Sequence, residues 1–291
     1  MEEERITAEK VEKTEKKVKI DIDRYRAKEG EKISLKKFST NCDMDVDKEY
    51  VKTVSMTAAL EELSLYQAKL YAQNTYGLII VLQAMDAAGK DGTIKHVFSH
   101  LDPNGVHVVS FKQPTTEEKD HDYMWRINKA LPRRGNIGIF NRSHYEDVVM
   151  PHVYGTYPED VWRARYDQIN DFERELAASG CAILKIFLVV SQEEQKKHFL
   201  GRLDDPTKFW KFDISDLEAR DRWDEYMAAW QEVFEKTSTA AAPWYLVPAD
   251  NRWYSRAVVS ELLRTTLKNM NMTWPPLEPE VDPDEVRRRL A

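Results

Sequence analysis

The chain has 291 residues, of which 32% are charged and 42% hydrophobic, and its formal net charge at pH 7 is −7. This length can bury a full core in one large α/β domain or two small ones, and the acidic balance argues against general nucleic-acid binding while leaving room for a local basic cleft. The amino terminus lacks a signal-peptide core, no apolar run approaches a membrane span, and the two cysteines lack metal-ligand spacing, so we expect a cytoplasmic protein with free thiols and no membrane or nucleic-acid partner.

Strand and helix patterns alternate along most of the chain. Residues 1–22 are predicted to form a charged tail, with 1–17 either a solvated helix or disordered, 23–270 to form one domain, and 271–291 a Pro-rich tail spread over the surface. Within these bounds, 19–47 is expected to be an extended arm over the domain surface. Helices are predicted over 57–73, 89–101, 115–131, 157–179, 191–204, 215–234 and 252–270, and strands over 78–82, 106–111, 137–140, 182–190 and 244–247. This alternation predicts a doubly wound parallel sheet with ligands at its carboxyl edge.

The segment over 76–101 has the pattern of a phosphate-binding loop. The unbroken apolar run over 78–82 suits a parallel strand covered on both faces, and an amphipathic helix begins after Gly89. Backbone N–H groups at such a turn and the helix dipole favour an anion, and Lys90 adds a cation. The pattern therefore predicts binding of a phosphate group.

The match to G-x-x-x-x-G-K-[ST] is imperfect. Ala84 replaces the first Gly, and Asp91 replaces the Ser or Thr that would hold magnesium. Within the loop, a lone carboxylate at Asp86 would repel phosphate unless a metal ion or a basic group lies between them. We interpret Asp86 as a magnesium ligand or as a base for the attacking phosphate. The structural alternative is an ordinary helix start with Asp86 as a loop cap.

A second polar cluster, N-R-S-H-Y-E-D over 141–147, follows the third predicted strand and so lies at the same sheet edge. Phosphoryl transfer needs metal ligands and a fixed cation for the charge of the transferred group. Arg142 can supply the cation, while Asn141 and Asp147 can hold metal directly or through water. His144 is better read as a structural or substrate-orienting residue than as a base, because phosphoryl acceptors are already ionised. A structural hydrogen-bond cluster is the alternative.

The segment over 196–222 contains seven cations and six acids, so it is no bulk basic patch. Its predicted helical hairpin is broken by a proline. Arg202, Lys208 and Lys211 could close over the phosphate loop as a lid. The alternative is a surface hairpin of exposed ion pairs, which stabilise little.

Four segments together resemble the family-2 polyphosphate kinases. They read Q-A-M-D-A-A-G-K-D-G-T-I-K-H-V, I-F-N-R-S-H-Y-E-D-V, K-H-F-L-G-R-L-D-D-P-T-K-F-W-K-F and T-S-T-A-A-A-P-W-Y-L-V-P-A-D-N-R-W, and the resemblance runs from about Asp23 to about Met270. It implies a three-layer P-loop kinase fold, a parallel sheet with helices on both faces and a helical lid. It also implies reversible, Mg²⁺-dependent transfer (with Mn²⁺ as a substitute) of the terminal phosphate of inorganic polyphosphate to nucleotides, with adenine or alternatively guanine as the base. A homo-oligomer, dimer or tetramer, is implied as well.

The resemblance assigns roles to individual positions. Asp86 matches the loop aspartate that binds metal and helps activate the acceptor, and Lys90 matches the phosphate-loop lysine. Arg142 matches the arginine after the second motif strand, and Arg202 the lid arginine. These four are expected to be catalytic, and the expected metal ligands are Asp86, Asn141 and Asp147.

The remaining positions are expected to bind substrate. They are Ala87, Ala88, Gly89, Asp91, Gly92, Asn141, His144, Glu146, Lys208 and Lys211. Asn141 stands where many members have Asp, and with His144, Glu146 and Asp147 it resembles the subgroup that phosphorylates both nucleoside mono- and diphosphates. Two competing readings share the same residues: a kinase with ATP as donor, and a non-catalytic nucleotide-binding module.

Overall fold

A five-stranded parallel sheet forms the centre of the computed structural model, which describes residues 20–42 and 44–291. The strand order is β2-β3-β1-β4-β5, so β1 pairs with β3 on one side and β4 on the other. Every residue of β1 is buried, as the continuous apolar run predicts. The five predicted strands are confirmed, and their bounds are β1 (Gly77–Ala84), β2 (Val106–Ser110), β3 (Ile137–Asn141), β4 (Cys181–Val189) and β5 (Trp244–Pro248).

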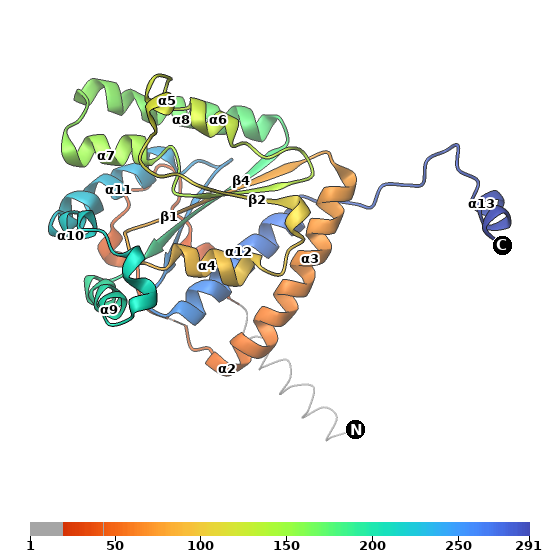
Figure 1. Ribbon diagram of the computed structural model, residues 1–291, viewed down its shortest axis with the longest axis horizontal. Helices are drawn as coiled ribbons and strands as arrows, with labels where there is room; N and C mark the ends of the chain where they lie inside the picture. Colours follow the sequence, from red (N-terminus) through yellow and green to blue (C-terminus); the bar gives the residue numbers. More distant parts are fainter. Residues whose placement is uncertain (1–19, 43) are drawn as a thin grey trace.

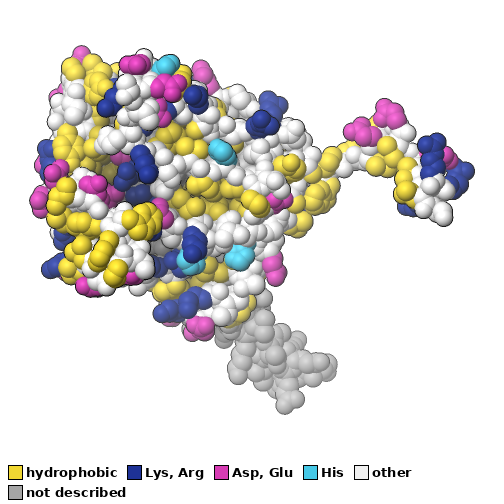
Figure 2. All heavy atoms as spheres, viewed as in Figure 1, with side chains coloured by type: hydrophobic (Ala, Val, Ile, Leu, Met, Phe, Trp, Pro, Cys, Tyr) yellow, Lys and Arg dark blue, Asp and Glu magenta, His cyan; other side chains and the backbone are white. Residues whose placement is uncertain are grey.

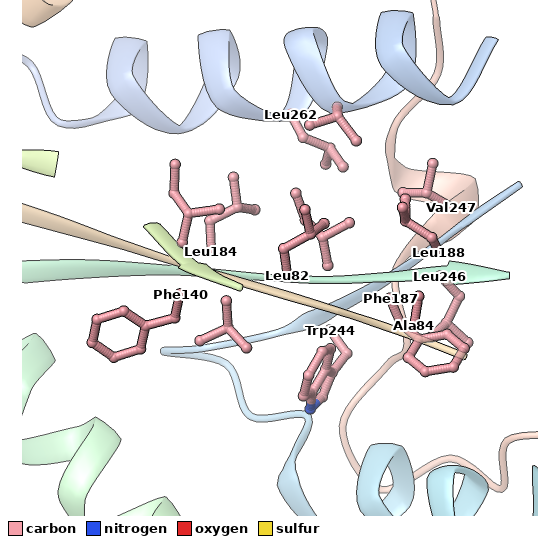
Figure 3. Close-up of a cluster of buried hydrophobic side chains, with 14 of the residues drawn as sticks. Leu82, Ala84, Phe140, Leu184, Phe187, Leu188, Trp244, Leu246, Val247 and Leu262 are labelled. Atoms are coloured by element: carbon pink, nitrogen blue, oxygen red, sulfur yellow. The ribbon is translucent and has the colours of Figure 1, made fainter. Parts of the chain in front are cut away.

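Helices cover both faces of this sheet (Figure 1). One face carries α3 (Met56–Gln73), α4 (Lys90–Phe98) and α12 (Arg252–Asn269), and the other carries α7 (Glu146–Tyr154), α8 (Glu159–Ala178) and α11 (Trp223–Thr237). In Figure 3, Leu262 of α12 packs above the strands, while Phe140 and Trp244 point to the opposite face. Side chains from both faces of each strand are therefore buried, and the three-layer fold is confirmed.

The connections contain short helical segments. Ahead of α3 lie η1 (Asp23–Tyr25), η2 (Leu35–Lys37), α2 (Lys48–Tyr50) and the π-helical η3 (Val51–Ser55); further on are η4 (Pro103–Gly105), α5 (Thr116–Lys119), α6 (Trp125–Lys129), α9 (Gln192–Leu203), η5 (Pro206–Lys211), α10 (Ser215–Asp221) and α13 (Pro283–Leu290). Among the described residues, none of the helices is both long enough and apolar enough to cross a membrane.

Two predicted helices are each divided in the structure. The capping box of Thr115 and Glu118 is present, but α5 ends at Lys119. Between α5 and α6, the Asp122 carboxylate accepts a hydrogen bond from the Met124 N–H at 2.9 Å. A short carboxylate that bonds the backbone two residues on favours a turn over a helix. The aromatic stripe expected on the second helix lies on α11.

The helix that precedes this stripe also starts differently from the prediction. Ser215 is not its cap, because the Ser215 hydroxyl bonds the Asp213 carboxylate at 2.8 Å and α10 ends at Asp221 before α11 begins. No helix was predicted over the residues of α7, which contains Pro151, a residue that disfavours a helix interior. At the chain end, the tail extends away from the body and ends in α13, so it is not spread over the surface as predicted (Figure 1).

Residues 20–42 and 44–47, hereafter the arm, lie along the outer edge of β5. Arg26 forms an antiparallel bridge with Tyr245, and the Ala27 N–H donates to the Trp244 carbonyl at 2.8 Å. Further along, the Asp250 N–H donates to the Thr40 carbonyl at 2.8 Å. The arm thereby covers an edge strand that would otherwise expose unpaired backbone groups. The extended arm is confirmed for its described part, and the prediction for 1–17 lies outside the described residues.

Candidate active site

The phosphate loop (85–89) links the end of β1 to the start of α4. Ala87 and Gly89 adopt left-handed backbone conformations, with φ of 62° and 104°. Helix α4 begins at Lys90, directly after Gly89. The free N–H groups of its first turn therefore lie at the carboxyl edge of the sheet, where they favour an anion.

A cavity of about 730 Å³, the active cavity, opens at this edge. It is bounded by the phosphate loop, the ends of β2 and β3, the segment from α9 to α10, and the first turns of α12. Figure 2 shows Lys and Arg side chains around the hollow between the α9–α10 segment and the helices on the opposite side. In the described part of the chain, nine Lys and Arg residues but only three acids line the cavity. Such a surface attracts a highly charged anion despite the acidic chain.

Asp86 and Arg142 form an ion pair across the floor of the cavity. The Arg142 Nη2 donates to Asp86 Oδ1 at 2.6 Å. Burial opposes the charge of Asp86, but Lys90 and Arg142 outweigh it and hold the pKa of this carboxyl below its ordinary value. Burial likewise lowers the pKa of the Lys90 ammonium, against the attraction of Asp86. Asp86 is thus an ionised carboxylate held between two cations.

Lys90 and Arg142 are positioned by the backbone around them. Lys90 Nζ donates to the Ala84 carbonyl at 3.1 Å, at the end of β1. Arg142 has a φ of 64°, and its N–H donates to the Leu82 carbonyl at 3.1 Å. Burial raises the pKa of the Glu146 carboxyl although Arg142 and Lys90 oppose it. Glu146 acts on Arg142 through charge and does not line the cavity.

Asn141 and Asp91 bring β3, α4 and the lid together at the rim. The Asn141 Nδ2 donates to Asp91 Oδ1 at 3.0 Å. Lys211 Nζ lies 3.9 Å from the other carboxylate oxygen of Asp91. Asp91, the carboxylate that replaces the usual hydroxyl, therefore accepts a hydrogen bond from Asn141 of β3 and lies near the ammonium of Lys211.

The predicted lid segment folds as α9, η5 and α10, and we call residues 192–221 the lid. Arg202 Nη1 donates to the Lys211 carbonyl at 2.8 Å and to Asp216 Oδ2 at 3.0 Å. Lys208 pairs with Asp205 at 2.7 Å, and Arg202, Lys208 and Lys211 all line the active cavity. The lid thus presents three cations to the phosphate loop.

Helix α9 also holds the phosphate loop in place. Gln195 Nε2 donates to the Asp86 carbonyl at 2.9 Å, and His198 Nδ1 lies 2.7 Å from the Ala87 carbonyl. Arg220 of α10 in turn donates to Gln195 Oε1 at 2.8 Å. The α9–α10 segment is therefore bonded directly to the phosphate loop.

Three of the predicted site residues do not line the active cavity, and their predicted substrate or metal roles are corrected: they are Glu146, whose charge acts on Arg142, and His144 and Asp147. His144 is 2% exposed, lies 3.6 Å from Glu173 and does not line the cavity. Asp147 accepts from Arg126 Nη2 at 3.2 Å and lines a separate cavity of about 370 Å³. Because α7 begins at Glu146, successive residues there rotate by about 100°. Residues adjacent in sequence consequently face different sides.

Besides Lys197 of the lid, three cations of the cavity were not assigned to it from the sequence. Lys112 follows β2, and Arg252 and Arg256 lie one turn apart at the start of α12. Burial and the charge of Arg252 lower the pKa of Arg256. The available signal was their position directly after a parallel strand, which places them at the carboxyl edge.

The donor set for a metal ion is small. Among residues 20–42 and 44–291, no three His, Cys, Asp or Glu side chains group closely enough to hold a metal ion. Mg²⁺ in kinase sites uses one or two carboxylates together with substrate phosphates and water. Asp86, ionised and beside the phosphate loop, fits this mode, and Asn141 lines the same cavity.

Comparisons with known proteins agree with this geometry. The family model described as Polyphosphate kinase 2 (PPK2) matches residues 45–275. An AMP/ADP-polyphosphate phosphotransferase of Meiothermus ruber is 42% identical over 270 residues, which cover 90% of this chain and 98% of that protein. An ADP-polyphosphate phosphotransferase of Rhodopseudomonas palustris is 40% identical over 274 residues, covering 90% and 95%. The crystal structure of polyphosphate kinase 2 from Arthrobacter aurescens TC1 has a TM-score of 0.86 and 38% identity, covering 94% of this chain and 99% of that one.

Proposed function

Because the chain belongs to the polyphosphate kinase 2 family, it is a polyphosphate-dependent nucleotide phosphotransferase, and we propose that it accepts both AMP and ADP. The observation that carries this proposal is the active cavity, in which Lys90, Arg142 and Arg202 surround a phosphate loop. An acceptor range that includes both nucleotides is supported by the printed activity of the Meiothermus ruber relative. Guanine nucleotides are proposed as alternative acceptors.

The proposed reaction is an in-line displacement at the terminal phosphorus of polyphosphate. An oxygen of the nucleotide phosphate forms a new P–O bond, the bond to the bridging oxygen breaks, and the shortened chain leaves with the electron pair. Lys90 and Arg142 stabilise the equatorial oxygens, and Arg202 completes the site when the lid closes. No proton has to be removed, since the acceptor phosphate is already ionised. The same groups serve the reverse direction.

We propose Mg²⁺ as the cofactor, with Mn²⁺ as a substitute. Asp86 would hold the ion, with the amide oxygen of Asn141 as a second donor. When bound, the ion would neutralise charge on the phosphate oxygens. Asp147 is no longer proposed as a ligand, because its carboxylate faces Arg126. We also propose a homo-oligomer, dimer or tetramer, which light scattering in solution would measure.

A matched pair of assays tests the reaction. Polyphosphate is supplied with AMP in one and with ADP in the other, both with Mg²⁺ and without ATP, and nucleotides are separated by chromatography. We expect ADP and then ATP from AMP, and ATP from ADP. Omission of Mg²⁺ is expected to abolish product, and Mn²⁺ to restore it in part.

The outcomes separate the competing readings. Product only when ATP is supplied as donor would overturn the assignment of polyphosphate. Turnover of ADP without turnover of AMP would leave the family function intact and remove the dual acceptor range.

A further inference from the structure

A second basic cavity lies on the arm, beside β5 and apart from the active cavity. It has a volume of about 410 Å³. Of the described residues, five cations and a single acid, Glu31, line it; the cations are Arg24, Arg26, Lys28, Lys32 and Lys37. The whole chain has a net charge of −7, so the lining of this cavity has the opposite sign of charge. A concave surface of one charge binds ions of the other.

Most of this positive charge is not neutralised by the arm. Lys28 lies 3.7 Å from Glu31, but in the described part of the chain no ion pair is formed by Arg26, Lys32 or Lys37. Glu29, next to Lys28 in the sequence, accepts a hydrogen bond from the Ala240 N–H at 3.0 Å. Like charges held close together repel unless an anion is shared between them.

Buried neighbours fix the backbone that displays these cations. Tyr25, at the end of η1, and Ala27 are buried on either side of Arg26, which bridges to Tyr245 of β5. Beyond the turn, Ile33 and Leu35 are buried, and the Ile33 N–H donates to Glu235 Oε1 at 2.9 Å. The cations therefore project from an anchored segment.

The arm cavity and the active cavity lie on either side of one turn. Ser39 lines the arm cavity, and the carbonyl of the next residue, Thr40, accepts from the Asp250 N–H at 2.8 Å. Two residues after Asp250, Arg252 lines the active cavity. The Asp250 carboxylate is engaged by the Ser191 N–H at 2.8 Å. A polyanion that leaves the active cavity over this turn would reach the arm.

We propose that the arm cavity is a second binding site for inorganic polyphosphate, which holds the distal part of a long chain while its terminal phosphate lies in the active cavity. This inference rests on the proposed function. The arm pairs with β5 through the Arg26–Tyr245 bridge, and the active cavity lies beyond the carboxyl end of this strand, whose five residues span roughly 17 Å at about 3.3 Å per residue. Only a chain long enough to reach from one cavity to the other engages both sites. Binding at the arm then raises the effective concentration of the terminal phosphate at the active cavity.

The test compares donors of two lengths with ADP as acceptor. In the double variant Lys32→Glu, Lys37→Glu, we expect the KM for long-chain polyphosphate to rise about tenfold, because avidity between linked sites is lost. The KM for tripolyphosphate and the kcat for both donors should stay within about twofold of wild type. The matched control is Lys69→Glu, Lys268→Glu, which changes the net charge equally at the amino edge of the sheet and should leave both KM values unchanged.

Two results would overturn the inference. One is an unchanged KM for long-chain polyphosphate in the arm variant. The other is an equal rise for both donors, which would indicate a general charge effect. Calorimetric titration of long-chain polyphosphate into wild type and the arm variant measures the site without turnover. Weaker binding by the arm variant alone supports the arm site, whereas absence of turnover in wild type would count against the proposed function and not against the binding site.

Discussion

The guanidinium of Arg142 donates to the carboxylate of Asp86 over 2.6 Å, and this bond joins the end of β3 to the loop after β1. Arg142 has a left-handed φ of 64°, which is uncommon for a residue with a side chain. The backbone turn redirects the side chain from the line of β3 toward the phosphate loop. One cation is thereby fixed between two neighbouring strands at the place where a transferred phosphate would lie.

Substitution of Arg142 by Lys is expected to lower kcat by roughly a hundredfold. The single ammonium of Lys cannot hold Asp86 and a phosphate oxygen at once as the guanidinium fork can. Steady-state rates with polyphosphate and ADP measure the effect. Arg134→Lys, in an exposed stretch before β3, is the control and should behave as wild type. A kcat for Arg142→Lys near that of wild type would contradict this role.

Lys90→Met tests the phosphate-loop cation. We expect kcat to fall by two to three orders of magnitude, roughly the size of effect seen when a group that stabilises transition-state charge is removed. Stability should change little, since the ammonium makes one hydrogen bond to a backbone carbonyl and its burial lowers its own pKa. Thermal unfolding followed by circular dichroism provides the second measurement. A variant that is folded and near-normally active would exclude Lys90 from the reaction.

Gly89→Ala tests the backbone turn of the loop. At a φ of 104° an alanine costs about 1–2 kcal/mol of strain, although a Cβ there would meet nothing within 4 Å. We expect the strain to lower the stability measured by urea unfolding. We also expect a higher KM for polyphosphate, because a change in the backbone would alter the direction of the loop N–H groups. Gly201→Ala in α9 is the matched control for stability. Its Cβ also meets nothing, and helix propensity predicts a gain of about 1 kcal/mol.

Arg202 and Asp216 test the lid. Replacement of Arg202 by Ala removes the bonds to Asp216 and to the Lys211 carbonyl, so we expect kcat to fall about tenfold or more when the closed lid lacks its cation. Asp216→Asn keeps a hydrogen-bond acceptor and leaves Arg202 charged, so its effect should be smaller. Measurement of kcat and KM for both variants shows which substitution has the larger effect. A larger loss in Asp216→Asn than in Arg202→Ala would reverse the assignment.

Glu173 and Lys185 form a buried pair behind the site, with Glu173 Oε2 2.6 Å from Lys185 Nζ. Burial opposes the charge of Glu173, but Lys185 and His144 together outweigh it and hold the pKa of this carboxyl below its ordinary value of 4.5. Its contribution to stability is therefore present above pH 4.5 and is lost as the pH falls through the lower folded-state pKa.

Glu173→Gln is expected to lower the free energy of unfolding at pH 7 by about 3 kcal/mol or more, because it leaves Lys185 buried without its counter-charge. The loss of stability below pH 4.5 should also be less steep in the variant. Urea unfolding across the acid range measures both effects. Equal slopes in the variant and wild type would show that Glu173 does not titrate with folding.

Some of the site followed from local pattern alone. The buried run of β1, the glycine before Lys90 and the position of Arg142 after a parallel strand predict an anion site at one sheet edge, and the structure brings Asp86, Lys90 and Arg142 together there. These features depend on residues close in sequence, whose backbone geometry is set by strand and helix periodicity. The lid cations were predicted for the same reason, as charges on a helical hairpin broken by Pro206.

Other parts were decided only when distant segments packed. His144 and Asp147 belong to the same short sequence as Arg142, yet His144, in the turn before α7, faces Glu173, and Asp147, in the first turn of this unpredicted helix, faces Arg126. Lys112, Arg252 and Arg256 join the cavity from two other strand ends, and no local pattern pairs them with the loop.

The amino-acid sequence by itself determined the parallel sheet, the phosphate loop and the charges available at one edge, because these follow from periodicity and from the chemistry of neighbouring residues. The tertiary structure alone decided which of those charges face one another and which are buried in pairs. It did so because helix rotation and the packing of segments far apart in the chain set side-chain direction, and neither can be read from a single stretch of residues.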